Sequence, residues 1–358
     1  MYNRGTAYLE KNNYKKALKC FLPIHKNFNF AELHINTGNA YRGLGQYSVA
    51  IDYYKRAIDI PDSNGRFGFL NSIAFNNLGL MAYLLGDSLT AESWYLRALA
   101  LDPLYSACIF NLAVARLKMS NCASGWAEYE YRGKNPCFGA KLPLGNSICV
   151  ICEQGIGDKI MFARYMPLLL KRYSNVYVVG HPSLAIFFPG CINVTSEPLG
   201  VPAVALCSLR LLLDCVPPIV GGWVGGSDVG VCWKGSDTHL NDANRSCPAA
   251  YFTRFNGVNL NPAVTHPKIP SLAPKTWGDT INFVRHCSHV VTVDTSVAHL
   301  CGMLGVPTIM IQPLVDTDFR WGAPGDINVW YPSVVVVHNK SWDSSMAIAQ
   351  DIIKCIKQ

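Results

Sequence analysis

Apolar and polar positions follow two different patterns along the chain, and the change comes near residue 141. Before it, small and aromatic residues recur at helical spacing, which predicts a run of amphipathic helices. After it, short apolar runs alternate with stretches of helical spacing. We expect strands at 148–151, 176–179, 201–206, 229–233, 290–293, 306–311 and 334–337, and helices at 159–173, 297–304 and 344–356. Because alternating strands and helices build a parallel sheet, ligand sites are expected at the carboxyl ends of the strands.

The helical part of the sequence repeats. Gly5, Ala17 and Phe21 recur as Gly38, Ala50 and Tyr54, and then as Gly79, Ala91 and Tyr95. The pattern resembles the tetratricopeptide repeat, whose period is about 34 residues. The small residues predict a close approach of two helices, with the aromatic residues filling the groove toward the next repeat. A turn-rich insertion at 62–65 lengthens the step to the third copy, and a degenerate fourth copy is expected over 105–126.

A repeat array of this kind supports two interpretations. Its concave surface can hold a partner or an acceptor, or its helices can simply buttress the next domain. The sequence leaves both alternatives open.

Composition and charge limit the class of protein. The length of 358 residues allows two or three domains, and a chain that is 50% hydrophobic and 15% charged is not disordered. Lys and Arg number 31 against 24 for Asp and Glu, so the formal charge is +7. This mild bias suits an anionic ligand such as a nucleotide sugar or a nucleic acid, but no run of basic residues marks a nucleic-acid surface.

The 14 cysteines are interpreted as reduced thiols, and their spacing matches no zinc site. Cys149 and Cys152 lie in an expected strand, where they point to opposite faces. The first residues show no apolar segment after a basic start, and no apolar stretch is long enough to cross a membrane. A cytoplasmic protein without a signal peptide is therefore expected.

Several motifs carry candidate chemistry. They are EQGIGDKIMFARYMPLL, VGVCWKG followed by NDANRS, VTVDTSVAHLCGMLGVPT, and DFRWG with WYPS, preceded by GWAEYEYR at 125–132. In order and spacing they resemble tetratricopeptide-repeat proteins fused to a heptosyltransferase-like domain, related to family nine of the glycosyltransferases. The layout is also similar to O-linked N-acetylglucosamine transferases, without their motifs.

This resemblance implies a fold class of α plus α/β. A helical repeat solenoid of three repeats and a degenerate fourth is expected over 1–140. It is followed by a GT-B pair of Rossmann-like halves, with the acceptor side over 141–222 and the nucleotide-sugar donor side over 223–358. Trp126, Tyr129 and Arg132 are expected to join the repeats to the transferase.

The GIGD segment provides the candidate catalytic residue. Gly155 and Gly157 allow a tight turn whose backbone N–H groups face the ligand, and Asp158 lies at the helix start. Asp158 could be an N-cap, worth about 1 kcal/mol. The resemblance favours the role of general base, which takes the proton from an acceptor hydroxyl. Gln154 either orients substrate or only ends the strand.

The donor-side candidates are Lys234, Arg245, Asp294, Thr295, Ser296 and His299. The DTS segment ends a strand and opens a helix, so its backbone donors would face a diphosphate. His299 could donate to a phosphate or only pack. The resemblance implies a transferase without a metal, and no acidic pair of the metal-binding type follows a strand. Lys234 and Arg245 would then neutralise the leaving diphosphate, unless they are ordinary solvated charges.

Two further features bear on the resemblance. In the block at 316–331, Arg320 is expected to pair with Asp318 and hold the loop. The chain also departs from the family: VNLNP occupies the place of a Ser-Leu-Gln strand, and the first Rossmann-like half is short. The identity of the sugar therefore does not carry over from the resemblance.

The sequence thus predicts an inverting, metal-independent glycosyltransferase with a nucleotide-sugar donor and no other cofactor. The acceptor is a glycan or a protein held by the repeats, and a modified nucleic-acid base is the less favoured acceptor. An interaction scaffold that has lost activity is the first alternative. A sugar-nucleotide epimerase or phosphorylase is the second, and its signatures are absent.

Overall fold

The computed structural model describes residues 1–60, 67–119, 122–133, 141–237, 239, 242–261, 264–313, 317–322, 328–339 and 341–356. The chain forms two compact units, Met1–Pro136 and Cys137–Gln358. The exact bounds expected for three domains, 1–140, 141–222 and 223–358, stay predictions. The insertion at 62–65 lies outside the described residues.

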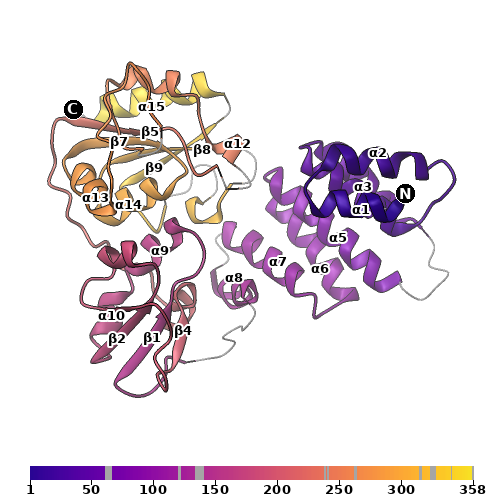
Figure 1. Cartoon of the computed structure of the whole chain (residues 1–358), viewed down its shortest axis with the longest axis horizontal. Coiled ribbons are helices and arrows are strands. Elements are labelled where there is room, and N and C mark those ends of the chain that lie inside the picture. The colour runs from indigo at the N-terminus through magenta and orange to yellow at the C-terminus, as the bar shows by residue number, and fades with distance from the viewer. Residues whose placement is uncertain are drawn as a thin grey trace. The chain divides into compact units, whose positions relative to one another are not determined.

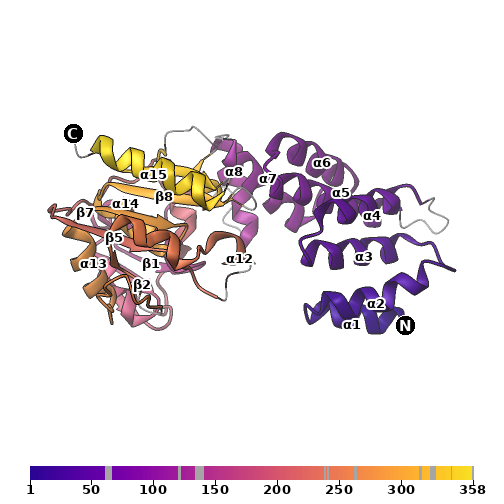
Figure 2. The same ribbon diagram turned by 90° about the horizontal axis from the view of Figure 1, so that it is seen from above.

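The first unit is a stack of helical hairpins (Figures 1 and 2). Its helices are α1 Tyr2–Glu10, α2 Tyr14–Ile24, α3 Ala31–Gly43, α4 Tyr47–Ile58, α5 Phe67–Leu84, α6 Ser88–Leu101, α7 Ser106–Lys118 and α8 Cys122–Tyr129. Each helix packs against the next one along the chain. The side chains of Asn13 and Asp87 cap α2 and α6 by accepting hydrogen bonds from backbone N–H groups, at 3.3 and 3.0 Å. Helices α7 and α8 occupy the range of the expected fourth copy.

One contact recurs in three of these hairpins: an aromatic ring of the second helix lies on a glycine of the first. The pairs are Gly5 with Phe21, Gly38 with Tyr54, and Gly79 with Tyr95. The close approach expected from the small residues is confirmed. The same rings also pack in hydrophobic clusters with the first helix of the next repeat: Phe21 with Leu33, Tyr54 with Leu78, and Tyr95 with Leu112. The expectation that the aromatic residues fill the groove toward the next repeat is therefore confirmed. The ring of Tyr14 reaches the next repeat as well, where it lies on Gly43 of α3.

Asparagine side chains link successive repeats. Asn77 on α5 donates to Asn39 on α3 at 3.3 Å, and Asn111 on α7 donates to Asn76 on α5 at 2.9 Å. Because a buried amide left without a partner is costly, these bonds fix how neighbouring hairpins align.

The segment at 125–132 closes the array. Trp126 and Tyr129 pack edge to face with ring centroids 5.4 Å apart, and Tyr129 lies 5.6 Å from Phe110 of α7. Arg132 forms an ion pair with Glu130 at 2.7 Å. The role expected for Trp126, Tyr129 and Arg132 in joining the two units stays a prediction.

The second unit contains two parallel sheets. The first has strands β1 Ser147–Ile151, β2 Asn175–Val179, β3 Ile192–Val194 and β4 Ala203–Ala205, in the order β3-β2-β1-β4. The second has strands β5 Asp228–Cys232, β6 Val258–Asn259, β7 Cys287–Val293, β8 Thr308–Pro313 and β9 Val334–Asn339, in the order β6-β5-β7-β8-β9. Parallel strands at the expected places are therefore present.

The helices of the second unit are α9 Ile156–Ala163, α10 Met166–Leu170, α11 Leu209–Leu213, α12 Asp242–Arg245, α13 Trp277–Arg285, α14 Ser296–Leu304 and α15 Trp342–Ile356. Short 3₁₀ helices include η3 Leu206–Ser208, η4 Ala249–Phe255 and η5 Phe319–Trp321. The single helix expected over 159–173 is wrong, since α9 and α10 divide that range. Pro167 lies in the first turn of α10, where its missing N–H needs no partner, whereas inside a longer helix it would break a hydrogen bond.

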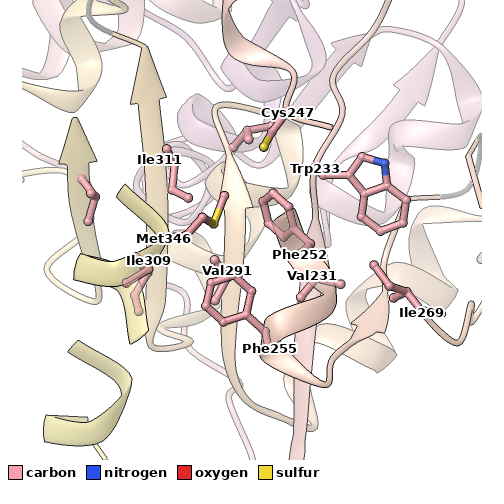
Figure 3. Close-up of a cluster of buried hydrophobic side chains, with 13 residues drawn as sticks. Val231, Trp233, Cys247, Phe252, Phe255, Ile269, Val291, Ile309, Ile311 and Met346 are labelled. Atoms are coloured by element: carbon pink, nitrogen blue, oxygen red, sulfur yellow. The ribbon is translucent and has the colours of Figure 1, made fainter. Parts of the chain in front are cut away.

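The core of the second sheet is formed on the face that α15 and η4 cover (Figure 3). Its members include Val231, Val291, Ile309 and Ile311 from the strands, Phe252 and Phe255 from η4, and Met346 from α15. Figure 2 shows α13 on the other side of the sheet from α15, so the strands are covered on both faces. Burial on both faces explains their nearly continuous apolar sequence.

None of the helices among the described residues combines the length and the apolar character that crossing a lipid bilayer requires.

The glycine contacts of the repeats predict a stability difference between two alanine variants of α5. A Cβ on Gly79 would lie 2.5 Å from Cε1 of the buried Tyr95 ring, so Gly79→Ala should lower the free energy of unfolding by about 1–3 kcal/mol. Gly68 on the same helix has only a backbone oxygen, at 4.0 Å, near that position. Gly68→Ala should therefore stabilise, by up to about 1 kcal/mol, through helix propensity. Urea unfolding followed by circular dichroism measures both, and equal stabilities would contradict the packing argument.

Candidate functional site

Each sheet has one point at which the strand order reverses, and ligands of parallel sheets bind beside such points at the carboxyl ends of the strands. In the first sheet the reversal lies between β1 and β4, and in the second between β5 and β7. The segment Gln154–Asp158 follows β1, Lys234 follows β5, and Asp294–Ser296 follow β7. The expected site residues are thus at the edges where the topology places a ligand.

The turn after β1 is strained and tightly bonded. Gln154 has a φ of +62°, a left-handed conformation that is costly for a residue with a side chain. Its carbonyl accepts a hydrogen bond from Lys159 Nζ at 2.9 Å. Asp158 is the third residue of α9, not its N-cap, and its Oδ2 accepts from the backbone N–H of Gly155, the N-cap, at 3.1 Å. The capping interaction proposed for Asp158 therefore exists in this modified form.

Gly157 brings the first turn of α9 against α14. A Cβ at Gly157 would lie 2.6 Å from Cδ2 of His299, so a larger residue here would collide with the imidazole ring. His299 is buried, with Nδ1 3.1 Å from the Tyr331 hydroxyl and its ring 4.6 Å from that of Trp321. Burial lowers the pKa of His299 to about 3, so the ring is neutral at pH 7. These contacts favour the packing role of His299 over a contact with phosphate.

Arg320 joins the Asp158 turn to the segment before η5. Its Nη2 donates to Asp158 Oδ1, while its Nη1 donates to both carboxylate oxygens of Asp318, at 3.0 and 2.8 Å. The expected pairing of Arg320 with Asp318 is confirmed. Its contact with Asp158, 162 residues away, was beyond sequence reasoning, although the DFRWG motif marked the segment. Arg320 is an additional candidate site residue.

Burial and the charge of Arg320 act in opposite directions on the pKa values of Asp158 and Asp318. Burial raises the pKa of Asp158, and Arg320 opposes that rise without cancelling it. Burial alone would also raise the pKa of Asp318, but the Arg320 guanidinium and a backbone hydrogen bond reverse this and hold it below its ordinary value.

The turn after β5 contains the other two basic candidates. Arg245 lies over Gly235, because a Cβ there would be 2.6 Å from Nη2, and its Nε is 3.4 Å from Asp242 Oδ1. Lys234 pairs with the exposed Asp237 at 2.5 Å. Arg245 is the more enclosed of the two, with 12% of its side chain exposed against 31% for Lys234. The guanidinium of Arg245 is thus held in place, whereas the ammonium of Lys234 lies at the surface.

The DTS segment opens α14 as expected. Asp294 Oδ1 accepts a hydrogen bond from the Trp321 indole N–H at 2.9 Å, and burial together with Asp318 raises the pKa of Asp294 to about 6, against the opposing charge of Arg245. Thr295 is the N-cap of α14 and is buried. Ser296 is the first helical residue. The N–H group of Ala298 donates to the Thr295 carbonyl at 3.0 Å, and the N–H groups of Ser296 and Val297 lie at the end of the helix where an anion would bind.

No three His, Cys, Asp or Glu side chains within the described ranges are grouped so that they could hold a metal ion.

Arg164, at the end of α9, holds the chain that leads from one sheet to the other. The residue is 1% exposed, and its guanidinium donates to the carbonyls of Pro218 at 3.0 Å, Trp330 at 2.8 Å and Pro217 at 2.6 Å. The hydroxyl of the next residue, Tyr165, donates to the Cys215 carbonyl at 2.6 Å. The second unit is therefore held together beside the site by a buried cation bonded to backbone oxygens.

Comparisons with known proteins identify the repeats. Tetratricopeptide repeat family models match residues 1–22 and 31–60, so the first unit contains tetratricopeptide repeats. No curated protein matches the chain.

Solved structures show similarity at low identity. A mutant O-GlcNAc transferase of Thermobaculum terrenum is 12% identical, with a TM-score of 0.35, over 98% of this chain and 90% of that one. MamA is 21% identical, with a TM-score of 0.29, over 36% of this chain and 71% of that one. The C-terminal part of a repeat-containing protein from Cytophaga hutchinsonii is 14% identical, with a TM-score of 0.17, over 37% of this chain and 77% of that one. The function has to be argued from the chain's own residues.

The Arg164 contacts predict a large stability difference between two neighbouring arginines. Arg164→Met would leave three carbonyls without their donor, which should lower the free energy of unfolding by at least about 3 kcal/mol. Arg172 is exposed and lies over the Tyr173 ring, so Arg172→Met should change it by about 0.5 kcal/mol or less. Urea unfolding followed by tryptophan fluorescence compares them. Similar values for the two variants would show that the carbonyl contacts contribute little.

Proposed function

We propose that the second unit is an inverting, metal-independent glycosyltransferase of the GT-B type, related to the heptosyltransferases. The observation that carries the proposal is the meeting of two strand-end segments: a carboxylate after β1 contacts the arginine of η5, and the same turn packs against the helix after β7. Two parallel sheets whose ligand-binding edges share contacts are what a transferase needs to hold an acceptor and a donor together. The motif resemblance falls on the same segments.

In this proposal Asp158 is the general base. It accepts the proton of the acceptor hydroxyl while that oxygen attacks the anomeric carbon of the sugar. The bond from the anomeric carbon to the phosphate oxygen breaks, and its electron pair leaves with the nucleoside diphosphate. Attack from the face opposite the leaving group inverts the configuration, and the proton on Asp158 passes to solvent afterwards.

The diphosphate is placed at the first turn of α14. The backbone N–H groups of Ser296 and Val297, together with the helix dipole, stabilise the charge that develops on the leaving group. Arg245 adds a fixed positive charge, and Lys234 contributes a weaker, more solvated one. The side chain of Asp294 is bonded to Trp321, so it acts by shaping this loop.

The repeats are assigned a part in holding the acceptor. Tetratricopeptide repeats present surfaces that suit a protein partner, so we infer that the first unit holds a protein or glycan acceptor. A nucleic-acid base remains the less favoured acceptor. A scaffold without activity would bind through the repeats but show no nucleotide-sugar turnover.

The base assignment predicts that Asp158→Asn abolishes transfer without abolishing donor binding. Asparagine keeps an oxygen for the Gly155 N–H but cannot take a proton, so turnover should fall by about 100-fold to 10,000-fold. Asp279 is a matched control, because it is also the third residue of its helix and accepts from the Thr276 N–H at 2.9 Å. Asp279→Asn should keep full turnover. Sugar transfer from a panel of nucleotide sugars, with and without EDTA, measures this, and active Asp158→Asn would remove Asp158 as the base.

The donor assignment predicts a binding defect for one of two arginines. A guanidinium bonded to a diphosphate is worth about 1.5–3 kcal/mol, so Arg245→Ala should weaken donor binding about 10-fold to 100-fold. Arg254, which pairs with Asp343 at 3.7 Å, is the control, and Arg254→Ala should bind as the wild type does. A thermal-shift screen with nucleotide sugars and free nucleotides identifies the ligand, and titration calorimetry gives the affinities. If Arg245→Ala binds the donor as tightly as the wild type does, Arg245 is an ordinary solvated charge. If no nucleotide raises the melting temperature, the result favours a scaffold without activity.

A further inference from the structure

Among the site residues, Arg320 is the one whose guanidinium donates to two carboxylates, those of Asp158 and Asp318, which differ in exposure. Its own side chain is 8% exposed, while that of Asp158 is 17% exposed and that of Asp318 is 30% exposed. The arginine is fixed from several directions. Its backbone N–H donates to Asp318 at 2.9 Å, its carbonyl accepts from Asn328 at 3.3 Å, and its guanidinium lies 4.5 Å from the Phe319 ring centroid.

A partly buried carboxylate tends to take up a proton, because burial disfavours its charged form. A general base must be unprotonated before the reaction, so such burial works against catalysis at neutral pH. Arginine does not lose its proton in proteins, and a guanidinium bonded to the carboxylate therefore favours the ionised state at every pH that matters. Asp318 has the opposite effect on Asp158, since it is a like charge and occupies one of the guanidinium nitrogens.

We propose that Arg320 is the positioning residue of this site, which keeps the Asp158 carboxylate charged and fixes its orientation, and that Asp318 limits how strongly it does so. The inference rests on the proposed function, in which Asp158 is the base. Oδ2 of Asp158 is held by the Gly155 N–H and Oδ1 by Arg320, so the plane of the carboxylate is set by two contacts. Each oxygen keeps a second lone pair for an acceptor hydroxyl, so the base works without breaking either bond.

Among the residues that the structure describes, the other groups near Asp158 leave this role to Arg320. From α14, His299 faces the same turn and is neutral, because burial lowers its pKa. Tyr331 is also neutral, because burial raises the pKa of its hydroxyl. On the helix of Asp158 itself, the ammonium of Lys159 is bonded to the Gln154 carbonyl. Asp294 is bonded to Trp321 and is raised in pKa by burial and by Asp318.

The proposal predicts shifts of opposite sign in two variants. Arg320→Met removes the cation, so the pKa of Asp158 should rise by about 1 unit or more. Asp318→Asn removes the competing carboxylate but keeps an oxygen for the Arg320 N–H, so the pKa of Asp158 should fall by about 0.5–1 unit. Arg320→Lys keeps the charge without the fork and should lie between wild type and Arg320→Met. If Arg320→Met does not fold, Arg320→Lys and Asp318→Asn still test whether the pKa of Asp158 shifts in opposite directions.

The first measurement needs no activity. Carboxyl carbons of ¹³C-labelled aspartate are titrated by NMR in the full chain, and the Asp158 signal is assigned by its loss in Asp158→Asn. Arg254→Met serves as the control, since its ion pair with Asp343 is formed elsewhere, and it should leave the titration unchanged. Opposite shifts in Arg320→Met and Asp318→Asn support the proposal. If the pKa of Asp158 shifts in the same direction in both variants, or does not shift, the proposal is overturned. A purely structural role of Arg320 does not predict opposite shifts.

The second measurement is the pH profile of kcat, whose acid limb should move with the pKa of Asp158 in each variant while KM for the donor stays within about 3-fold. Turnover with an unshifted acid limb would keep the transferase and overturn the role of Arg320. The expected NMR shifts without turnover of any donor would support the electrostatic role of Arg320 and contradict the transferase.

Discussion

The first turn of α9 lies so close to the ring of His299 that glycine is needed at position 157. This contact connects the ends of two strands that belong to different sheets, because α9 follows β1 and α14 follows β7. On one side it brings Asp158 within reach of Arg320. On the other it holds the ring of His299 against Trp321, whose indole N–H is bonded to Asp294. The close approach of Gly157 to His299 thus determines where Asp158, which follows a strand of the first sheet, meets Arg320 of the second.

The two buried arginines of this unit show that partners decide what a buried charge does. Arg164 is bonded to three backbone carbonyls, which carry dipoles but no net charge, so its effect is to hold chain segments in place. Arg320 is bonded to two carboxylates, whose charge depends on pH and on each other. Removing a partner from Arg164 leaves polar groups unsatisfied, whereas removing a partner from Arg320 changes the protonation of the group that remains. The first arginine serves mainly stability, and the second is suited to chemistry.

The sequence pattern predicted those elements whose residues lie close together along the chain. The repeats, the strands of the first sheet at 148–151 and 176–179, and the helix at 297–304 were each visible as a run of residues of one periodicity, and all are present within a few residues. Strands β3 and β6 are three and two residues long, too short for a period to show, and the break between α9 and α10 depends on one proline. The turn at Asp158 and the DTS segment were found because each motif lies within one strand-to-helix junction. The link from Asp158 to Arg320 depends on the packing of two sheets, and no local spacing encodes it.

Capping and catalysis were alternative interpretations of Asp158, and the geometry shows that one residue can satisfy both. Its Oδ2 serves the cap, as the same atom of Asp279 does on α13, while its Oδ1 is bonded to a guanidinium. A left-handed residue precedes both helices, Gln154 before α9 and Ala273 before α13, so backbone conformation does not distinguish the two helix starts. A cap alone needs no buried arginine from a distant segment, and the described contacts of Asp279 on α13 include none. A buried arginine at the start of α9, with no described counterpart at the start of α13, is a cost that a purely structural turn has no reason to carry. The cap is better understood as what holds the base: a carboxylate fixed through one oxygen loses little further freedom when the other meets an acceptor.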